Sequence, residues 1–423
     1  MNIATSRLIA GIAAVGIAGL VLSACSRPPS TGEGEGEGGD TVTASPGITE
    51  DTIKIGSSLP LSGPLSRNGE TQLASMQAYV DALNADGGVT MGDGNTREVE
   101  FVYYDDAYDP SRLVQNFQRL VDQDQVFATY GMFGTASNLA VMPTANELEV
   151  PQVFLGTGAA AFSEDREANP YTLGWWPTYQ NEAATFGEYL VSLDEPMTVA
   201  FLAQNDDQGE AYLDGLTSAI EGSQVELVDQ ASFSSTDTVY DSQVSALAAS
   251  EADAFFSGVN VPSAQTAVLE KLGDLQWSPI TYLPIVSAAP DVVREASAGD
   301  YLPELYSGAF TKWPCSPADE EDEDVQNYLD AMAEYSPDVE ACYINTVFGW
   351  AMADTLTKAL EATQEPTRES FMEAIAGLQT DEISLMHDDL TLDGGNLGSP
   401  PIADLAVRKW ASDDDDWMTA DLD

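Results

Sequence analysis

Two loops built of small residues, at positions 134–137 (GTAS) and 156–160 (GTGAA), have the composition of an anion-binding site. Each loop follows a segment that we predict to be a strand, and its small side chains leave backbone N–H groups accessible. The first loop leads into a predicted helix, whose N-terminus attracts negative charge. Thr135 adds a hydroxyl group, and we expect it to contact the ligand. The alternative, which is compatible with that role, is that Thr135 caps the helix.

The other polar residues form no enzyme signature. The sequence has no GxSxG, HExxH, Walker or CxxC pattern, and its single histidine, His387, leaves no histidine-based catalytic dyad. Acidic residues are so numerous that catalysis by carboxylates alone stays open. We nevertheless expect a binding protein with no catalytic residue, metal or cofactor.

The N-terminal segment has the features of a secretory signal peptide. Arg7 precedes an apolar stretch, residues 8–22, that is too short to span a hydrocarbon core of roughly 30 Å. Residues 22–25 (LSAC) resemble the bacterial lipobox, in which Cys25 receives a lipid; an ordinary signal peptide with an incidental cysteine is the alternative. Residues 1–24 are then the signal peptide, and residues 25–49 form a flexible, lipidated linker. This predicts a protein anchored at the extracytoplasmic face of the cell membrane.

The chain is strongly acidic, with 70 Asp and Glu residues, 15 Lys and Arg residues and a formal net charge of −55. A surface this negative repels phosphate backbones, which excludes nucleic acid as a partner. The runs at 320–324 (EEDED) and 413–416 (DDDD) lack the spaced ligands and turn glycine of a calcium loop. We predict that both runs are solvated surface.

The acidic composition also predicts adaptation to high salt, because screening shortens the range of self-repulsion. We expect the Tm of the purified protein to fall when it is moved from concentrated salt into dilute buffer, as measured by thermal unfolding. A protein that keeps its full Tm in dilute buffer would contradict this hypothesis.

Two of the three cysteines, Cys315 and Cys342, remain once Cys25 is assigned to the anchor. Disulfides persist in exported proteins, so we predict a bridge between them. The chain-entropy estimate for such a short loop is roughly 3–4 kcal/mol of stabilisation. The alternatives are two separate buried thiols, or a metal pair that only His387 could assist.

Strand and helix patterns alternate along most of the chain. Strands are expected at 53–56, 99–104, 126–131, 153–155, 198–203, 225–228 and 254–257, with short ones near 390 and 406. Helices are expected at 73–83, 109–120, 137–148, 210–220, 242–249, 263–272, 343–362 and 367–378. This alternation predicts parallel sheets with helices on both faces and ligand binding at the carboxyl edge of the strands. Two successive blocks of the pattern indicate two similar α/β lobes.

Six segments in this order resemble a known family: 61–64 (LSGP), 104–110 (YDDAYDP), 134–141 (GTASNLAV), 151–154 (PQVF), 176–180 (WPTYQ) and 204–209 (QNDDQG). Over about residues 51–410 the chain resembles the type I periplasmic-binding-protein family, in its leucine/isoleucine/valine-binding branch. The resemblance implies two doubly wound parallel-sheet lobes joined by a three-crossover hinge. The lobes would comprise residues 50–177 with 307–386, and residues 178–306 with 387–420.

The resemblance implies that the lobes close on a small-molecule ligand and that the closed form docks on an ABC transporter permease. It also implies that Thr135, Ala136, Gly158 and Ala160 grip a ligand carboxylate, with alanine at 160 where the family commonly has Ser or Thr. Further contacts expected near the cleft are Asn68, Tyr108, Trp176, Tyr179, Gln208, Val259 and Asn260. Trp175 and Trp176 could line the pocket or only pack the hinge.

The resemblance does not assign residues to the part of the ligand opposite its carboxylate. Acidic residues that bind an ammonium group in the family would fall at 177–178 and 285–286, and none of these positions is acidic here. Asp206 and Asp207 could substitute, but we favour helix caps; the pair Asp105 and Asp106 corresponds to a structural turn of the family. The expected ligand is a branched-chain or other hydrophobic amino acid, or an aromatic or aliphatic acid. The alternatives are an amide or urea-type ligand, or a sensor of the same fold coupled to a signalling partner.

Overall fold

The computed structural model describes residues 42–63, 65–234, 237, 239–297, 302–317, 319–412 and 416–420. The predicted signal peptide, Cys25 and most of the predicted linker lie outside these residues, as do Pro64 and residues 413–415. No helix within the described ranges is long and apolar enough to cross a membrane.

The first sheet has the strand order β2-β3-β1-β4-β5-β6. β1 pairs in parallel with β3 and β4, and β2 runs antiparallel to β3. The strands are β1 (Thr52–Leu59), β2 (Val89–Thr90), β3 (Thr96–Asp105), β4 (Ala128–Tyr130), β5 (Gln152–Leu155) and β6 (Thr172–Gly174). The associated helices are α1 (Ser66–Ala85), α2 (Pro110–Asp122), α3 (Thr135–Glu147), η1 (Ala160–Phe162), α9 (Glu323–Tyr335), α10 (Ile344–Ala362) and α11 (Arg368–Gly377). A small ladder joins β12 (Gln379–Thr380) to β13 (Leu392–Asp393).

The second sheet has the order β15-β14-β11-β10-β9-β7-β8. Its strands are β7 (Met197–Gln204), β8 (Val225–Phe233), β9 (Ala254–Gly258), β10 (Ile280–Leu283), β11 (Leu305–Ala309), β14 (Ala406–Ala411) and β15 (Asp416–Thr419). Strands β7 to β11 are parallel, and β14 and β15 extend the sheet in antiparallel fashion. Its helices are α4 (Tyr179–Ser192), α5 (Asp207–Ile220), α6 (Asp241–Ala248), α7 (Pro262–Leu275), η2 (Ile285–Ser287) and α8 (Pro290–Ser297).

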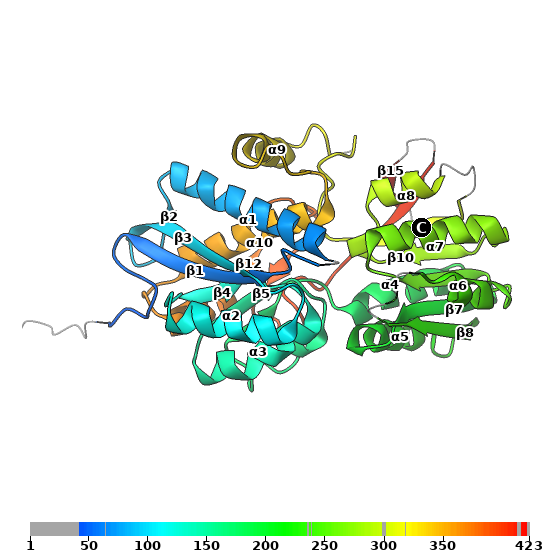
Figure 1. Cartoon of the computed structure of the whole chain (residues 1–423), viewed down its shortest axis with the longest axis horizontal. Coiled ribbons are helices and arrows are strands. Elements are labelled where there is room, and N and C mark those ends of the chain that lie inside the picture. Colours follow the sequence, from blue (N-terminus) through cyan, green and yellow to red (C-terminus); the bar gives the residue numbers. More distant parts are fainter. Residues whose placement is uncertain are drawn as a thin grey trace, which may run out of the picture. The chain divides into compact units, whose positions relative to one another are not determined.

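Both sheets are covered by helices on two faces, as the alternating pattern predicts (Figure 1). In the second sheet, Phe201 and Phe256 pack with Phe186 of α4, whereas Leu202 and Phe255 join the core on the side of α6 and α7. Successive strand residues point to opposite faces, so both faces of β7 and β9 are apolar. This is the pattern of a buried parallel sheet and confirms the predicted doubly wound α/β fold.

The chain passes between the two sheets three times, after β6, after β11 and after β13. Two sheet memberships differ from the predicted lobe ranges. Residues 307–309 form the end of β11 in the second sheet, and β13 pairs beside α11 of the first. The crossing segments have neither the helical nor the strand pattern of apolar residues. The predicted boundaries of the lobes therefore rested on the resemblance alone.

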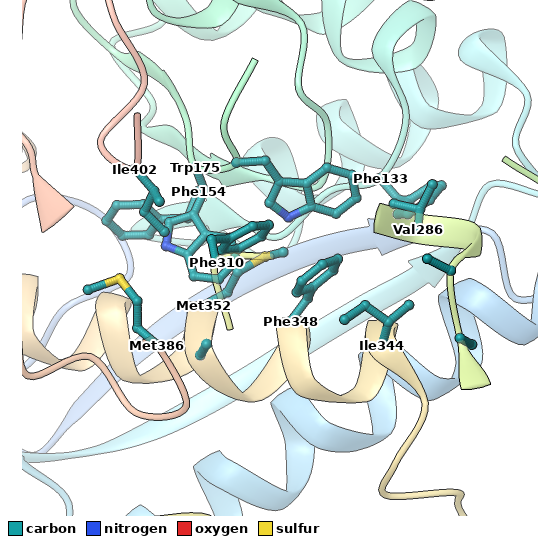
Figure 2. Packing of buried hydrophobic residues seen from close by; sticks show 14 of the residues in the cluster. Phe133, Phe154, Trp175, Val286, Phe310, Ile344, Phe348, Met352, Met386 and Ile402 are labelled. Carbon is teal, nitrogen blue, oxygen red and sulfur yellow. The ribbon is translucent and has the colours of Figure 1, made fainter. Parts of the chain in front are cut away.

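Aromatic and aliphatic residues from all three crossings meet α10. Phe310 stacks on Phe348 with ring centroids 4.9 Å apart, and Trp175 packs on Phe310 at 5.5 Å. Ile402, on the third crossing, is fully buried in the same cluster. Figure 2 shows Phe348 and Ile344 projecting from one helix beside Phe310 and Trp175. The junction between the sheets is therefore a packed apolar core.

The predicted disulfide is present. Cys315 is bonded to Cys342 across 27 residues, with their Cα atoms 5.7 Å apart. The bond ties the segment after the second crossing to the residues that precede α10, which excludes the separate thiols and the metal pair.

The prediction of solvated surface is wrong for part of each acidic run. Asp322 caps α9 and accepts a hydrogen bond from Lys312 Nζ at 2.7 Å, and Asp324 accepts from Ser384 Oγ at 2.7 Å. Asp416, the last residue of the second run, is buried. A run of like charges conceals such roles, because capping and pairing depend on neighbours that are distant in the sequence.

Candidate functional site

The two loops of small residues lie side by side at the carboxyl edge of the first sheet. Gly134 N donates to Gly156 O at 3.2 Å, and Phe133 and Gly156 form a parallel bridge just beyond β4 and β5. The parallel order β4-β5 places both loops at the same edge. The sequence prediction that these loops act together is consistent with this geometry.

A chain of hydroxyl groups connects the loops to the first crossing. Thr135 Oγ1 lies 2.7 Å from Thr157 Oγ1, which lies 3.2 Å from the Tyr179 hydroxyl. Tyr179 N also donates to Gly158 O at 2.9 Å. Gly134, not Thr135, is the N-cap of α3 and makes no side-chain cap bond. The alternative role of Thr135 as a cap is therefore wrong, and its hydroxyl belongs to the inter-loop chain.

Two tyrosine rings lie directly on the glycines of these loops. A Cβ atom at Gly134 would come within 2.6 Å of the Tyr108 ring, and one at Gly158 would come within 2.9 Å of the Tyr179 ring. Gly134 also has a φ of +96°, which L side chains rarely adopt. Only glycine allows the rings and the loop backbone to approach so closely.

Trp176 and Phe133 form an apolar wall beside the hydroxyl chain. Their ring centroids are 6.2 Å apart, and Trp176 also packs on Phe348 at 5.0 Å. Trp176 is only 6% exposed, yet its Nε1–H has no hydrogen-bond partner among the described residues. Trp175 differs, because its Nε1 donates to Thr355 Oγ1 at 3.1 Å. Trp175 thus packs the junction, whereas Trp176 retains a donor that a ligand could use.

Tyr108 is a predicted contact with an exposed aromatic side chain in this region. Its side chain is 39% exposed, and its ring packs near Phe133. Desolvation, then the neighbouring Tyr179 and Asp206, raise the pKa of the Tyr108 hydroxyl, so it stays a neutral donor at physiological pH. Because Asp206 follows β7, Tyr108 lies within electrostatic reach of the second sheet.

The candidates from the second sheet form their own group. Gln208 Oε1 accepts from Asn260 Nδ2 at 2.7 Å, and Val259 is buried with its carbonyl accepting from Ser287 Oγ. Asn260 Oδ1 is buried without a partner among the described atoms. Asp206 caps α5 by accepting from Gly209 N at 3.2 Å, which confirms the favoured interpretation of this residue.

Three other predicted residues, Asn68, Ala136 and Ala160, take no part in the hydroxyl chain. Asn68 is buried on α1, where its Oδ1 accepts from the Tyr343 hydroxyl at 3.1 Å. Ala136 is exposed in the first turn of α3, where the backbone N–H groups lack intrahelical partners, and Ala160 is buried in η1. No interaction that the structure records joins any of these three side chains to Thr135.

Asp105 and Asp106 hold a turn, as favoured from the sequence. Asp106 accepts from Ser58 Oγ and Tyr108 N, each at 2.8 Å, and Asp105 accepts from Ser62 Oγ at 2.7 Å. Desolvation raises the pKa of Asp106 to about 6. Within the described part of the chain, no cluster of three or more His, Cys, Asp or Glu residues is arranged to hold a metal ion.

Sequence reasoning missed two important polar residues, Thr157 and Glu182. Glu182 is buried on α4 and accepts from Ile285 N at 2.7 Å, Tyr212 at 3.0 Å and Tyr282 at 3.4 Å. Burial raises its pKa to about 7. Thr157 could have been predicted, because it is the one hydroxyl residue of the second loop. Glu182 could not, because one Glu among so many acidic residues does not stand out in the sequence.

Comparison with known proteins gives a consistent result. The family profile described as periplasmic binding protein matches residues 52–414. A relative from Pseudomonas aeruginosa, named leucine-, isoleucine-, valine-, threonine-, and alanine-binding protein, is 25% identical over 179 residues, which is 42% of this chain and 46% of the relative. The chain thus matches less than half the length of this relative.

Two solved structures share the fold. The fatty acid ABC transporter substrate-binding protein from Thermomonospora curvata has a TM-score of 0.73 at 19% identity, covering 90% of this chain and 96% of that one. A solute binding protein from R. palustris in complex with benzoate has a TM-score of 0.70 at 14% identity, covering 87% and 96%.

Proposed function

The chain belongs to the periplasmic binding protein family, and from this premise we propose that it captures a small carboxylate-bearing molecule for an ABC importer. It is a solute-binding protein of the type I fold and not an enzyme. In the proposal, the ligand binds between two lobes that close around it, with crossings near residues 177, 310 and 402. The folded part is held outside the cell membrane by a lipid on Cys25.

The hydroxyl chain from Thr135 through Thr157 to Tyr179 is the observation that carries this proposal. It joins Thr135, the first residue of α3, to the second loop, so these hydroxyls lie beside the first-turn N–H groups of the helix. Such a group of neutral donors suits a carboxylate. Because Thr157 also bonds to Tyr179, loss of the Thr135 hydroxyl leaves the rest of the chain in place.

The walls favour a ligand whose body is apolar. Trp176, Phe133 and Tyr108 surround the loops, and none of residues 177, 178, 285 and 286 offers a carboxylate for an ammonium group. Glu182, a buried acid on α4, is already bonded to Ile285 N and two tyrosines, and buried Asp106 is already bonded to Ser58 Oγ and Tyr108 N. The relatives are named as a binding protein for leucine, isoleucine, valine, threonine and alanine, as a fatty acid transporter's substrate-binding protein, and as a solute binding protein in complex with benzoate. We propose that an apolar monocarboxylate of this range binds better than an α-amino acid.

Replacement of Thr135 by valine tests the carboxylate contact. We expect the affinity for the stabilising acid to fall about tenfold, since one hydrogen bond to a charged group contributes about 1.5 kcal/mol. Leucine, benzoate and octanoate are the probes, first by thermal shift and then by calorimetric titration.

Thr135→Ser is the matched control, because it keeps the hydroxyl and should retain most of the affinity. Both variants should keep the Tm of the unliganded protein within a few degrees. Unchanged affinity of Thr135→Val for every acid that stabilises the wild type would remove Thr135 from the site. Stronger stabilisation by leucine than by benzoate or octanoate would refute the preference against an ammonium group.

A further inference from the structure

Three basic side chains are buried within the described ranges: Arg97, Lys312 and Arg408. Arg97 forms a bidentate ion pair with Asp93, with N–O distances of 2.9 and 2.7 Å. Lys312 pairs with Asp322 and Asp388 at 2.7 and 2.8 Å. Arg408, which is 7% exposed, forms no ion pair with any described residue.

The hydrogen bonds of Arg408 to described residues use only the two N–H groups of Nη2 and leave the other three of its guanidinium unused. Nη2 donates to Thr311 O at 2.6 Å and to His387 Nε2 at 2.6 Å. His387 is a neutral acceptor, because desolvation and the nearby positive charges of Arg408 and Lys312 lower its pKa to about 4. Nε and Nη1 of Arg408 have no hydrogen-bond partner within the described structure. The carboxylates of Asp319 and Asp416 favour the charged form of Arg408, but neither lies within ion-pair distance of it.

This guanidinium lines a small cavity at the junction of the two sheets. The cavity has a volume of about 20 Å³, enough for one small group. Two hydroxyl side chains, Ser307 and Thr311, lie on its wall with Arg408, and the rings of Trp313 and Trp417 supply apolar sides. Ile344, at the start of α10, also lines the cavity, and Figure 2 shows this side chain projecting from the helix.

A buried cation that forms no direct ion pair is costly, and the carboxylates of Asp319 and Asp416 offset the charge of Arg408 only from a distance. Burial lowers the pKa of Arg408 to about 10, which leaves it charged at physiological pH. The unused N–H groups and the size of the cavity suit a compact anion. The Thr311 hydroxyl adds a donor, whereas the Ser307 hydroxyl already donates to Gly308 O. We propose that this cavity binds one small anionic group, a halide ion or a carboxylate, through Arg408. None of its lining residues belongs to the Thr135 loops, so the proposal does not depend on the proposed carboxylate site there.

The test uses the full mature chain at constant sodium concentration, with gluconate replaced stepwise by chloride. This substitution keeps screening of the acidic surface unchanged, and gluconate is too large for the cavity. We expect a saturable rise in Tm of roughly 2–4 °C in the wild type. Arg408→Gln should abolish the saturable rise.

Lys409→Gln is the matched control, because it removes the same charge from the same strand at a side chain that is 47% exposed. It should respond to chloride as the wild type does. If Arg408→Gln does not fold, Thr311→Val replaces it, and we expect its apparent Kd for chloride to rise several-fold. Thr135→Val should leave the chloride titration unchanged, which separates this site from the proposed ligand site.

Formate and benzoate identify the source of the anion. Saturable stabilisation by chloride or formate that is lost in Arg408→Gln supports a site for free small anions. Stabilisation by benzoate alone, lost in Arg408→Gln and reduced by added chloride, supports a contact with the acid group of a bound ligand. No saturable response to any of the three anions, or equal responses in Arg408→Gln and Lys409→Gln, would overturn the proposal.

Discussion

Replacing Phe348 by alanine is expected to lower the free energy of unfolding by about 3–5 kcal/mol, because a fully buried aromatic side chain is removed from a packed core. Phe348 joins α10 to the crossings, because its ring packs on those of Phe310 and Trp176 with centroid distances of 4.9 and 5.0 Å. The cavity would therefore open beneath the wall of the proposed ligand site. Urea unfolding followed by circular dichroism measures the loss.

Phe371→Ala is the matched control for position. Phe371, on α11, is equally buried. Its ring packs edge-on against Phe127, the residue before β4, and it has no recorded ring contact with the residues of the crossings. Both variants should lose stability to a similar extent. Only Phe348→Ala should also increase the quenching of tryptophan fluorescence by acrylamide, since Trp175 and Trp176 contact residue 348. Phe348→Leu, which conserves most of the volume, should lose less than about 1.5 kcal/mol.

A loss below 1 kcal/mol in Phe348→Ala would show that the junction is not a single packed core. Equal quenching in the two alanine variants would show that Trp175 and Trp176 do not depend on α10. Either result would weaken the proposal that Trp176 is held rigidly as one wall of the binding site.

The fold was predictable wherever local chemistry and periodicity agreed. Asp109 and Pro110 predicted the start of α2, and the structure has the Asp109 carboxylate accepting from Ser111 N at 2.8 Å. The alternating strands and helices likewise predicted two parallel sheets. The missed elements included α4, β10, α8, β11 and α9. α9 begins inside an acidic run, and β11 follows residues that have no regular spacing of apolar side chains. The sequence around each element therefore did not predict it.

The candidate site was predictable as loops but not as a network. The family resemblance and the small residues after two strands together pointed to residues 134–137 and 156–160, and the structure places these loops side by side. The hydroxyl chain and the unpaired Trp176 Nε1 arise from distances between segments more than twenty residues apart. Sequence spacing carries no information about such contacts, because they are set by how helices pack on the sheet.

Glu182 is the residue where this limit has the largest consequence. It connects α4 to the start of η2 through Ile285 N, and Tyr212, one of its partners, packs against Tyr179 with ring centroids 5.1 Å apart. A buried carboxylate with a pKa of about 7 holds a proton in the folded protein at a pH where the unfolded chain has lost it. The stability of the protein is thus linked to pH through a side chain that adjoins the proposed site.

The sign of this linkage follows from proton binding. Between pH 4.5 and 7 the folded state binds more protons at Glu182 than the unfolded state, so stability falls as pH rises. Above pH 7 both states are ionised, and the loss is complete. We expect Glu182→Gln to remove this component, so that its unfolding free energy relative to wild type rises by about 2–3 kcal/mol between pH 5 and pH 8.

Urea unfolding of wild type and Glu182→Gln at pH 5, 6, 7 and 8, at one high salt concentration, measures this difference. Asp106, whose pKa is also raised, contributes equally to both proteins and cancels in the comparison. Glu188→Gln makes the same charge change at an exposed position of α4 and should follow the wild type at every pH. If the curves of Glu182→Gln and wild type remain parallel from pH 5 to 8, Glu182 does not hold its proton in the folded state. The three hydrogen bonds to Glu182 would then outweigh its burial, and the carboxylate would be a fixed anion beneath the site.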